Sequence, residues 1–162
     1  MSAARTAGKV ARVQVPEHLL VHLRRARDTV DRRYADPLDL DELASAASVS
    51  KFHFLRCFTA TYGRTPAGYL TERRIERAQD LLRATNLTVT EVCHLVGYTS
   101  LGSFSTRFRE LVGESPSAYQ ARWAAGTPRI PGCWVFMHAR SDGGPNDARF
   151  AIGEKPSPGG AS

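Results

Sequence analysis

Apolar side chains recur at helical spacing along two long stretches of the chain. One stretch runs from Pro16 to about Tyr34, and the other runs from Pro66 to about Ala84. Apolar residues at i, i+3, i+4 and i+7 share one face of an amphipathic helix, and proline is favoured in the first turn. The pattern therefore predicts two long helices with buried faces made of Leu19, Leu20, Leu23, Ala26 and Val30, and of Tyr69, Leu70, Ile75, Ala78, Leu81 and Leu82.

The sequence around these helices repeats. The motif G-x-[ST]-P-x-x-Y occurs at Gly63–Tyr69 and again at Gly113–Tyr119, an offset of 50 residues. Three upstream residues recur at the same offset: Ser50, Phe54 and Phe58 correspond to Ser100, Phe104 and Phe108. Farther upstream the offset falls to 49, where DLDELA (39–44) corresponds to TVTEVC (88–93). We infer two copies of one structural unit that differ by one residue in a single turn.

The second copy is predicted to be a short helix, a tight turn and a second helix. Thr88 and Glu91 form the capping box of a helix over residues 89–96, which Gly97 ends. Ser100 is the expected N-cap of the next helix. The apolar stripe of that helix is made of Leu101, Phe104, Phe108 and Leu111, and Gly113 ends the helix.

The first copy follows the same course, with caps at Asp39 and Ser50 and a stop at Gly63. A short helix, a turn of a few residues and a second helix form the helix-turn-helix arrangement. The predicted fold is therefore all-α, with two tandem helix-turn-helix subdomains joined by the long helix over 66–84. At about 1.5 Å per residue this connector is about 28 Å long, close to the spacing of about 34–36 Å between successive major grooves on one DNA face.

These elements divide the chain into three expected parts. They are a basic flexible arm, a tandem helix-turn-helix domain and a partly disordered tail, over residues 1–16, 17–126 and 127–162. Within the domain, the expected bounds of the first unit, the connector and the second unit are about 17–65, 66–84 and 88–125. In the tail, the apolar runs 133–139 and 148–152 flank a turn-rich segment, which predicts a short β-hairpin.

The formal net charge of +6 and the sequence pI of about 9.6 favour an anionic partner. Residues 17–126 contribute only +2 of this charge, from 15 basic and 13 acidic side chains, so a nucleic-acid face there requires charge segregation. The three cysteines lack C-x-x-C spacing, and they predict neither a disulfide framework nor a zinc site. Because no apolar run resembles a signal peptide or a membrane span, we expect a cytoplasmic protein with no membrane partner.

Taken together, the stretch from about Leu38 to Trp123 resembles the DNA-binding domain of the AraC/XylS family of transcription regulators. The likeness is strongest over VGYTSLGSFSTRFRELVGESPSAY, Val96–Tyr119. The resemblance implies a sequence-specific, nucleoid-associated regulator, by the family's usual behaviour an activator, with two recognition helices in adjacent major grooves of double-stranded DNA. It implies RNA polymerase as a partner, and no catalytic residue, metal or cofactor. The short flanks are similar to those of the small stand-alone members, which can act as monomers.

The resemblance also assigns base-contacting positions: Phe52, Leu55 and Arg56 in the first copy, and Leu101, Gly102, Ser105 and Thr106 in the second. Arg56 is the strongest candidate because arginine can bond guanine O6 and N7 together, the alternative being a solvated arginine on a helix face. Leu55 offers only an apolar contact to a thymine methyl or a sugar edge, and Phe52 either does the same or packs in the core. The small side chains of the second set discriminate bases weakly, so the second copy is expected to anchor more than to specify.

Candidate phosphate contacts flank these positions. They are Ser50, Lys51, Arg64, Thr65, Ser100, Arg107 and Arg109. Hydroxyls and backbone N–H groups at helix starts can bind phosphates, although capping alone explains the two serines and the threonine equally well. The family often has an arginine where Thr106 stands, and in this chain the arginine lies one position along.

Two other classes of function stay open on the sequence. A metal site could use His18 and His22, which have the i, i+4 spacing of a zinc pair, but no third ligand is evident. A DNA-repair methyl acceptor with a similar module would need a reactive cysteine, whereas we interpret Cys57 and Cys93 as packing residues. The tail could serve as a thiol or ligand sensor centred on Cys133, or as an added strand that binds a protein.

Overall fold

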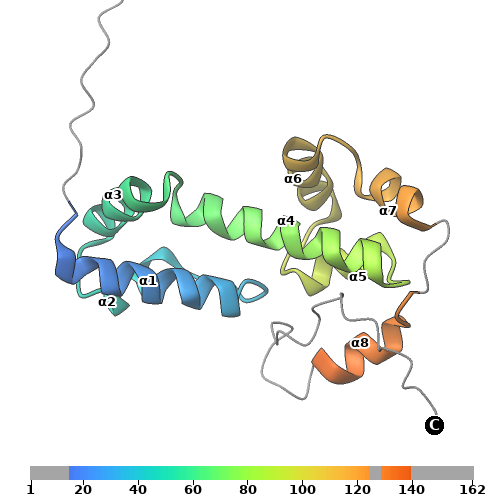
Figure 1. Cartoon of the computed structure of the whole chain (residues 1–162), viewed down its shortest axis with the longest axis horizontal. Helices are drawn as coiled ribbons and strands as arrows, with labels where there is room; N and C mark the ends of the chain where they lie inside the picture. Colours follow the sequence, from blue (N-terminus) through green and yellow to red (C-terminus); the bar gives the residue numbers. More distant parts are fainter. Residues whose placement is uncertain (1–14, 125–128, 140–162) are drawn as a thin grey trace, which may run out of the picture. The chain divides into compact units, whose positions relative to one another are not determined.

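A computed structural model describes residues 15–124 and 129–139 of the chain. The described part is helical (Figure 1). An isolated parallel β-bridge joins Thr85 to Ile130. The helices of the described part are α1 (Glu17–Arg32), α2 (Leu40–Ala46), α3 (Lys51–Tyr62), α4 (Pro66–Ala84), α5 (Val89–Leu95), α6 (Leu101–Val112), α7 (Pro116–Ala124) and α8 (Gly132–Ala139). The prediction of an all-α fold is confirmed for these residues.

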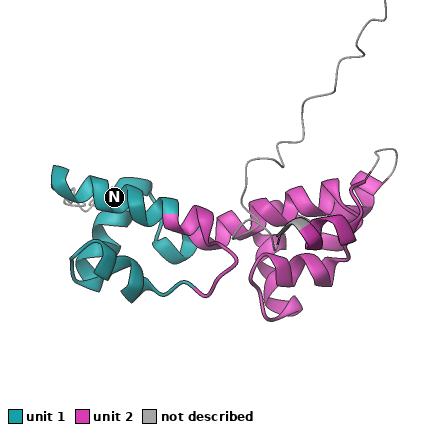
Figure 2. Cartoon of the chain, turned by 90° about the horizontal axis from the view of Figure 1, so that it is seen from below, with its two compact units in different colours: residues 1–28, 38–69 teal, residues 29–37, 70–162 magenta. Residues whose placement is uncertain are grey.

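The described residues form two compact units (Figure 2). Unit 1 holds residues 15–28 and 38–69, and unit 2 holds residues 29–37, 70–124 and 129–139. Each unit contains one helix-turn-helix, made of α2 and α3 in unit 1 and of α5 and α6 in unit 2.

Buried aromatic rings form the centre of unit 1. Phe54 and Phe58 on α3 are fully buried, with ring centroids 5.7 Å apart. The Phe58 ring also lies 4.6 Å from that of Tyr62 and 6.0 Å from that of Tyr69. Because rings of this size remove a large apolar area from water, this cluster fixes which face of α3 points inward.

Unit 2 is built in the same way around α6. Phe104 and Phe108 are fully buried with centroids 5.7 Å apart, and Phe108 lies 5.5 Å from Tyr119 on α7. The predicted apolar face of α4 adds Ile75 and Leu82 to this core, both almost fully buried. The matched phenylalanines of the repeat therefore have matched structural roles.

Arg74 on α4 forms hydrogen bonds with the segment that follows α1 in unit 2. Its Nε donates to the carbonyl oxygen of Tyr34 at 2.6 Å, and its Nη2 donates to that of Asp36 at 2.9 Å. Its guanidinium carbon lies 5.6 Å from the ring centroid of Tyr98. The hydrophobic pattern does not reveal this contact, because an arginine on an amphipathic helix is usually a solvent-exposed residue.

The predicted helix N-caps are confirmed. The side-chain oxygens of Asp39, Ser50 and Ser100 each accept a hydrogen bond from a backbone N–H of the first turn that follows. Thr88 and Glu91 form the predicted capping box, in which the Thr88 N–H donates to the Glu91 carboxylate at 2.7 Å. These hydrogen bonds hold the pKa of Glu91 below its usual value.

The turn of the helix-turn-helix is one residue shorter in unit 1, as the change of repeat offset predicts. Residues 47–50 link α2 to α3, whereas residues 96–100 link α5 to α6. In each turn one residue adopts a left-handed conformation, Ser48 with φ 54° and Gly97 with φ 86°. The N–H of the next residue then bonds to the carbonyl five residues earlier, which closes the helix end in both units.

Three glycines at helix ends differ in the space available for a Cβ atom. Gly63 and Gly113 end α3 and α6 with φ of 72° and 90°, and a Cβ at either position would meet no atom within 4 Å. A Cβ at Gly97 would lie 2.5 Å from the carbonyl oxygen of Ala35. Only Gly97 is therefore required by close packing as well as by its backbone conformation.

The predicted β-strand over 133–139 is wrong, because these residues belong to α8. An unbroken apolar run has no periodicity that separates a strand from a helix. The start of α8 is fixed by the Gly132 N–H, which donates to Asn86 Oδ1 at 2.6 Å, and Val135 alone among the apolar residues 133–137 is buried. The other predicted strand, 148–152, lies outside the described residues.

The predicted apolar stripe of α6 is also partly wrong. Leu101 and Leu111 are 43% and 49% exposed, while the two phenylalanines between them are buried. Each leucine lies three positions from a phenylalanine, which is about 60° around a helix of 3.6 residues per turn. Both leucines also lie in the terminal turns of α6, so they fall at the margin of the buried face.

Candidate nucleic-acid interface

The face of α3 opposite its buried rings carries the first set of predicted base-contacting residues. Phe52 is 79% exposed, Arg56 is exposed and Leu55 is half-buried. They stand at i, i+3 and i+4, so the structure brings them to one side of the helix. The core-packing alternative for Phe52 is excluded by its exposure.

The two basic residues on this helix differ in their partners. Arg56 makes no hydrogen bond or ion pair with any residue that the structure describes. Lys51 in the first turn bonds to the Asp41 carboxylate of α2 at 2.9 Å, which raises the pKa of Lys51. Arg56 is thus available to a ligand without breaking a contact with any described residue, whereas Lys51 would have to leave Asp41.

The second predicted set lies on α6. Gly102 and Thr106 are exposed on the side away from Phe104 and Phe108, Ser105 is half-buried beside them, and Leu101 is exposed at the margin of the buried face. No side chain in this set is longer than leucine, so the face presents hydroxyls, methyl groups and bare backbone.

Basic residues border the α6 face. Arg107 Nη1 donates to Glu110 Oε2 at 2.7 Å, whereas exposed Arg109 makes no ion pair within the described residues. An open hollow of about 370 Å³ adjoins them and is lined by Ser105, Thr106, Arg109, Glu110 and Ser115. The structure therefore brings predicted base and phosphate positions of unit 2 to one concave patch, together with one carboxylate.

The three hydroxyl residues predicted near helix starts are capping residues. Ser50, Ser100 and Thr65 accept hydrogen bonds from the backbone N–H groups of His53, Ser103 and Gly68, at 3.3, 3.4 and 3.1 Å. All three are exposed, as is the remaining predicted phosphate contact, Arg64.

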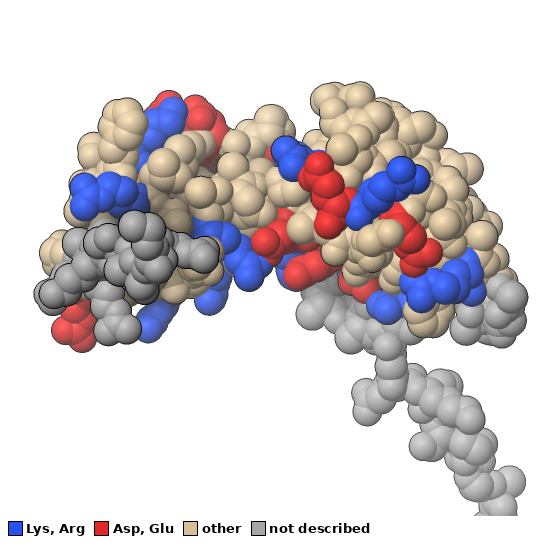
Figure 3. Space-filling view, turned by 90° about the horizontal axis from the view of Figure 1, so that it is seen from above, with Lys and Arg blue, Asp and Glu red and all other residues tan. Residues whose placement is uncertain are grey.

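Charge is mixed on one face of the described surface. On the face shown in Figure 3, groups of Lys and Arg lie next to groups of Asp and Glu, and uncharged residues cover most of the rest. Ion pairs among the described residues include Arg73 with Glu76 and Arg83 with Asp80. The charge segregation that the net charge of residues 17–126 predicts for a nucleic-acid face is not seen on this face.

The cysteines in the helical body are packing residues. Cys57 and Cys93 are fully buried, and burial raises the pKa of both thiols, which opposes formation of the reactive thiolate. Cys57 Sγ lies 3.6 Å from His53 Nε2 within α3. Cys133 in the tail is exposed.

The described residues include no group of three or more His, Cys, Asp or Glu side chains that could hold a metal ion. His18 and His22 therefore have no third ligand there. Within the same residues, no helix is both long enough and apolar enough to span a membrane.

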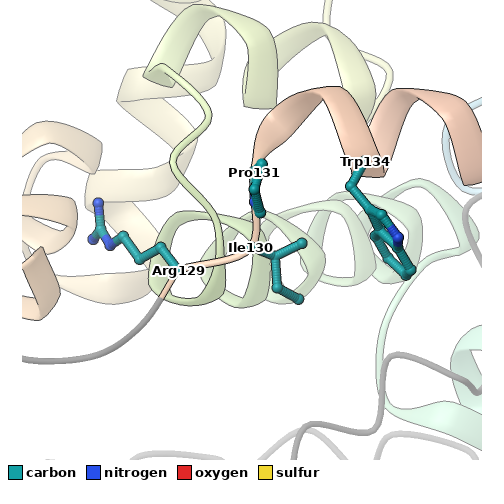
Figure 4. Close-up of a pocket in the computed structure, with 4 residues that line it drawn as sticks. All are labelled: Arg129, Ile130, Pro131 and Trp134. Atoms are coloured by element: carbon teal, nitrogen blue, oxygen red, sulfur yellow. The ribbon is translucent and has the colours of Figure 1, made fainter.

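An apolar hollow of about 390 Å³ lies beside α8, lined by Arg129, Ile130, Pro131 and Trp134 (Figure 4). The side chains of Ile130 and Trp134 lie on the same side of the chain in this view, and Arg129 extends away from them. Arg129 Nη2 instead donates to the carbonyl oxygens of Leu82 and Gln120 at 3.4 and 3.2 Å. Because no lining charge faces the hollow, its chemistry indicates no specific ligand.

The sequence of this chain is similar to those of known proteins. A family model described as a helix-turn-helix domain matches residues 43–122. A putative AraC-like transcription regulator of Streptomyces antibioticus is 32% identical over 139 residues, which cover 74% of this chain and 46% of that protein. The HTH-type transcriptional activator AarP of Providencia stuartii is 32% identical over 91 residues, which cover 56% of this chain and 67% of that protein.

The fold of this chain is also similar to that of a solved DNA-binding domain. The DNA-binding domain of the global transcriptional factor AdpA, solved in complex with a target DNA, has a TM-score of 0.57 and 29% identity, over 68% of this chain and 96% of that one. Several curated relatives are longer proteins, of which this chain spans between 28% and 46%. The likeness therefore concerns only part of those proteins.

Proposed function

This chain belongs to the AraC family of helix-turn-helix transcription regulators, and from that membership we propose that it binds double-stranded DNA with α3 and α6 in adjacent major grooves. In this proposal Phe52, Leu55 and Arg56 contact bases in one groove. Leu101, Gly102, Ser105 and Thr106 face the bases of the other.

The observation that carries the proposal is the matched pair of faces on α3 and α6. Each helix buries two phenylalanines at equivalent positions and leaves the opposite side open. Arg56 is exposed, with no ion pair among the described residues, and a free guanidinium can bond both acceptors of guanine in the major groove. A helix that carries such a side chain on an unobstructed face has the chemistry of a recognition helix.

Phosphate contacts complete the proposed interface. They are made by Ser50, Lys51, Arg64, Thr65, Ser100, Arg107 and Arg109. Lys51 and Arg107 are held by Asp41 and Glu110 in the free protein, so they would exchange a carboxylate for a phosphate on binding. This exchange limits their gain in affinity, because the lost ion pair offsets part of the new one.

Salt dependence and footprinting test this proposal. Neutralised phosphates release counterions, so the affinity for duplex DNA should fall steeply with salt. Two recognition helices about one duplex turn apart should protect about 20 base pairs. If the purified protein prefers no genomic fragment over random duplex at low salt, the proposal is wrong.

We further propose that the chain activates transcription through RNA polymerase, as a monomer on its site. AarP, a relative that this chain matches over 67% of its length, is described as a transcriptional activator. Transcription in vitro with purified polymerase tests the direction: the protein should raise transcript from a promoter that carries its selected site. A fall in transcript on the same template would make it a repressor.

A further inference from the structure

The turn that precedes α6 is held from two sides within unit 2. On one side, the Ala35 carbonyl lies so close to Gly97 that a Cβ there would be 2.5 Å from its oxygen. On the other side, the guanidinium carbon of Arg74 lies 5.6 Å from the ring centroid of Tyr98. Both contacts fall in residues 96–100, where the chain enters α6.

Arg74 connects the two sides of this turn. Its Nε and Nη2 donate to the carbonyl oxygens of Tyr34 and Asp36, the residues on either side of Ala35, at 2.6 and 2.9 Å. A guanidinium can hold two acceptors in its plane while its face lies over an aromatic ring. The same side chain therefore fixes the backbone around Ala35 and covers the ring of Tyr98.

Tyr98 passes this restraint to α6. Its ring lies edge-on to that of Phe104, with centroids 5.4 Å apart, and fully buried Phe104 helps to fix the inward face of α6. The Tyr98 N–H donates to the carbonyl oxygen of Cys93 on α5 at 3.0 Å. The turn residue that Arg74 contacts is thus packed against both helices of the second helix-turn-helix.

Arg74 is committed to the protein and not to solvent. Its side chain is half-buried, and burial lowers the pKa of the guanidinium. We propose that Arg74 is a positioning residue for DNA binding: it holds the turn in the place from which α6 presents its open face to the major groove. This inference rests on the proposed function, and it assigns a role in binding to a residue outside the DNA face.

Loss of Arg74 should weaken binding although the side chain does not touch DNA. Two hydrogen bonds from a charged donor can shift a local equilibrium by about a hundredfold. The apparent affinity of a protein falls in proportion to the fraction of molecules in the binding-competent arrangement. Arg74→Gln should therefore bind its duplex about tenfold more weakly, with the loss confined to the half of the site that unit 2 covers.

The experiment uses the full chain and a duplex selected for tight binding from a random library. The half in which Arg56→Ala loses base preference is the half that unit 1 covers. Fluorescence anisotropy gives the dissociation constants, and hydroxyl-radical footprinting gives the protection of each half. Binding is measured at a temperature where urea denaturation shows each variant to be fully folded. Arg74→Gln should lose protection mainly in the half that unit 2 covers.

Two further variants separate positioning from charge. Arg74→Lys keeps the positive charge but not the planar fork, so it should bind about as weakly as Arg74→Gln, whereas lysine would restore a simple phosphate contact. This conservative variant also decides the question if Arg74→Gln does not fold. Arg73→Gln, with the same change of charge on the neighbouring residue, is the control, since Arg73 pairs with Asp31 and Glu76. It should bind like the wild type.

Three results would overturn the inference while the proposed function stands. In the first, folded Arg74→Gln or Arg74→Lys binds as tightly as the wild type. In the second, protection falls equally in both halves of the site, so the residue supports the fold as a whole. In the third, Arg73→Gln shows the same selective loss, so the effect is one of charge. If selection yields no preferred duplex at all, the proposed function itself fails.

Discussion

The helices α3 and α6 bury matched pairs of phenylalanines, whereas buried Cys57 of α3 corresponds to exposed Arg107 of α6 and their open faces carry different residues. Phe54 and Phe104 correspond, and both are fully buried. On the open faces, the aromatic ring of Phe52 in unit 1 corresponds to Gly102 in unit 2, which has no side chain. The guanidinium of Arg56 corresponds to the small hydroxyl side chain of Thr106. The fold constrains one side of each recognition helix and leaves the other free for chemistry.

The turns between the helices show a similar difference. Ser48 and Gly97 both take left-handed backbone, where a side chain costs about 1–2 kcal/mol. In unit 1 the side chain of Ser48 is exposed to solvent, whereas in unit 2 the carbonyl of Ala35 leaves no space for a Cβ at Gly97. The glycine is thus required by packing in unit 2, and not by the turn alone.

The largest effect that we expect concerns Gly97. Gly97→Ala combines an unfavourable φ with a backbone clash, and should lower the free energy of unfolding by more than about 2 kcal/mol. Gly63→Ala is the matched control: it has an unfavourable φ but open space, and should cost about 1–2 kcal/mol. Urea denaturation followed by circular dichroism measures both. Equal losses would show that the contact with Ala35 is not tight in solution.

The next effect separates the two recognition helices. Arg56→Ala should reduce the ratio of specific to nonspecific affinity about tenfold, because a bidentate base contact is worth about 1–3 kcal/mol. Thr106→Ala, at the corresponding position of α6, should leave that ratio nearly unchanged. Competition between the selected duplex and its single-base variants measures the ratio. Loss of base discrimination in Thr106→Ala but not in Arg56→Ala would reverse the proposed roles of the two units.

Ser48→Gly should have a smaller, stabilising effect. Relief of the left-handed strain gains about 1–2 kcal/mol, and the added freedom of glycine in the unfolded chain removes about 0.4–1 kcal/mol of this. The expected net gain is about 0.5–1 kcal/mol in the free energy of unfolding. Ser45→Gly, inside α2, is the control and should destabilise. A loss in Ser48→Gly would mean that the serine hydroxyl stabilises the turn.

The parts of this structure that follow from local chemistry could be predicted from the sequence. Thr88 and Glu91, the serine caps and the helix-ending glycines each act through residues close in sequence. Other features depend on contacts between residues distant in sequence, which hydrophobic periodicity does not predict. They are the hydrogen bonds of Arg74, the close approach of Ala35 to Gly97 and the start of α8, where Gly132 bonds to Asn86. Burial of the phenylalanines was predicted, but the exposure of Leu101 and the ion pairs of Lys51 and Arg107 were not.

The smallest effect concerns the capping box, which distinguishes α5 from α2. The Glu91 carboxylate accepts hydrogen bonds from both the N–H and the hydroxyl of Thr88 at 2.7 Å, whereas Asp39 caps α2 through the Asp41 N–H at 3.3 Å. The pKa of Glu91 is lowered by folding. The ionised Glu91 carboxylate therefore contributes fully to stability above the pKa of the unfolded state, about 4.3. This contribution is lost as the pH falls through the pKa of the folded state.

Glu91→Gln keeps an acceptor for the Thr88 N–H but removes the charge. The variant should be slightly less stable than the wild type at pH 7, and the difference in unfolding free energy should close as the pH falls below about 4.3, because the wild-type carboxylate is then protonated too. Glu42→Gln, at the corresponding position of α2, is the control. Denaturation at a series of pH values measures both variants. A pH-dependent difference of the same size in Glu42→Gln would show a general effect of net charge and contradict the role given to the capping box.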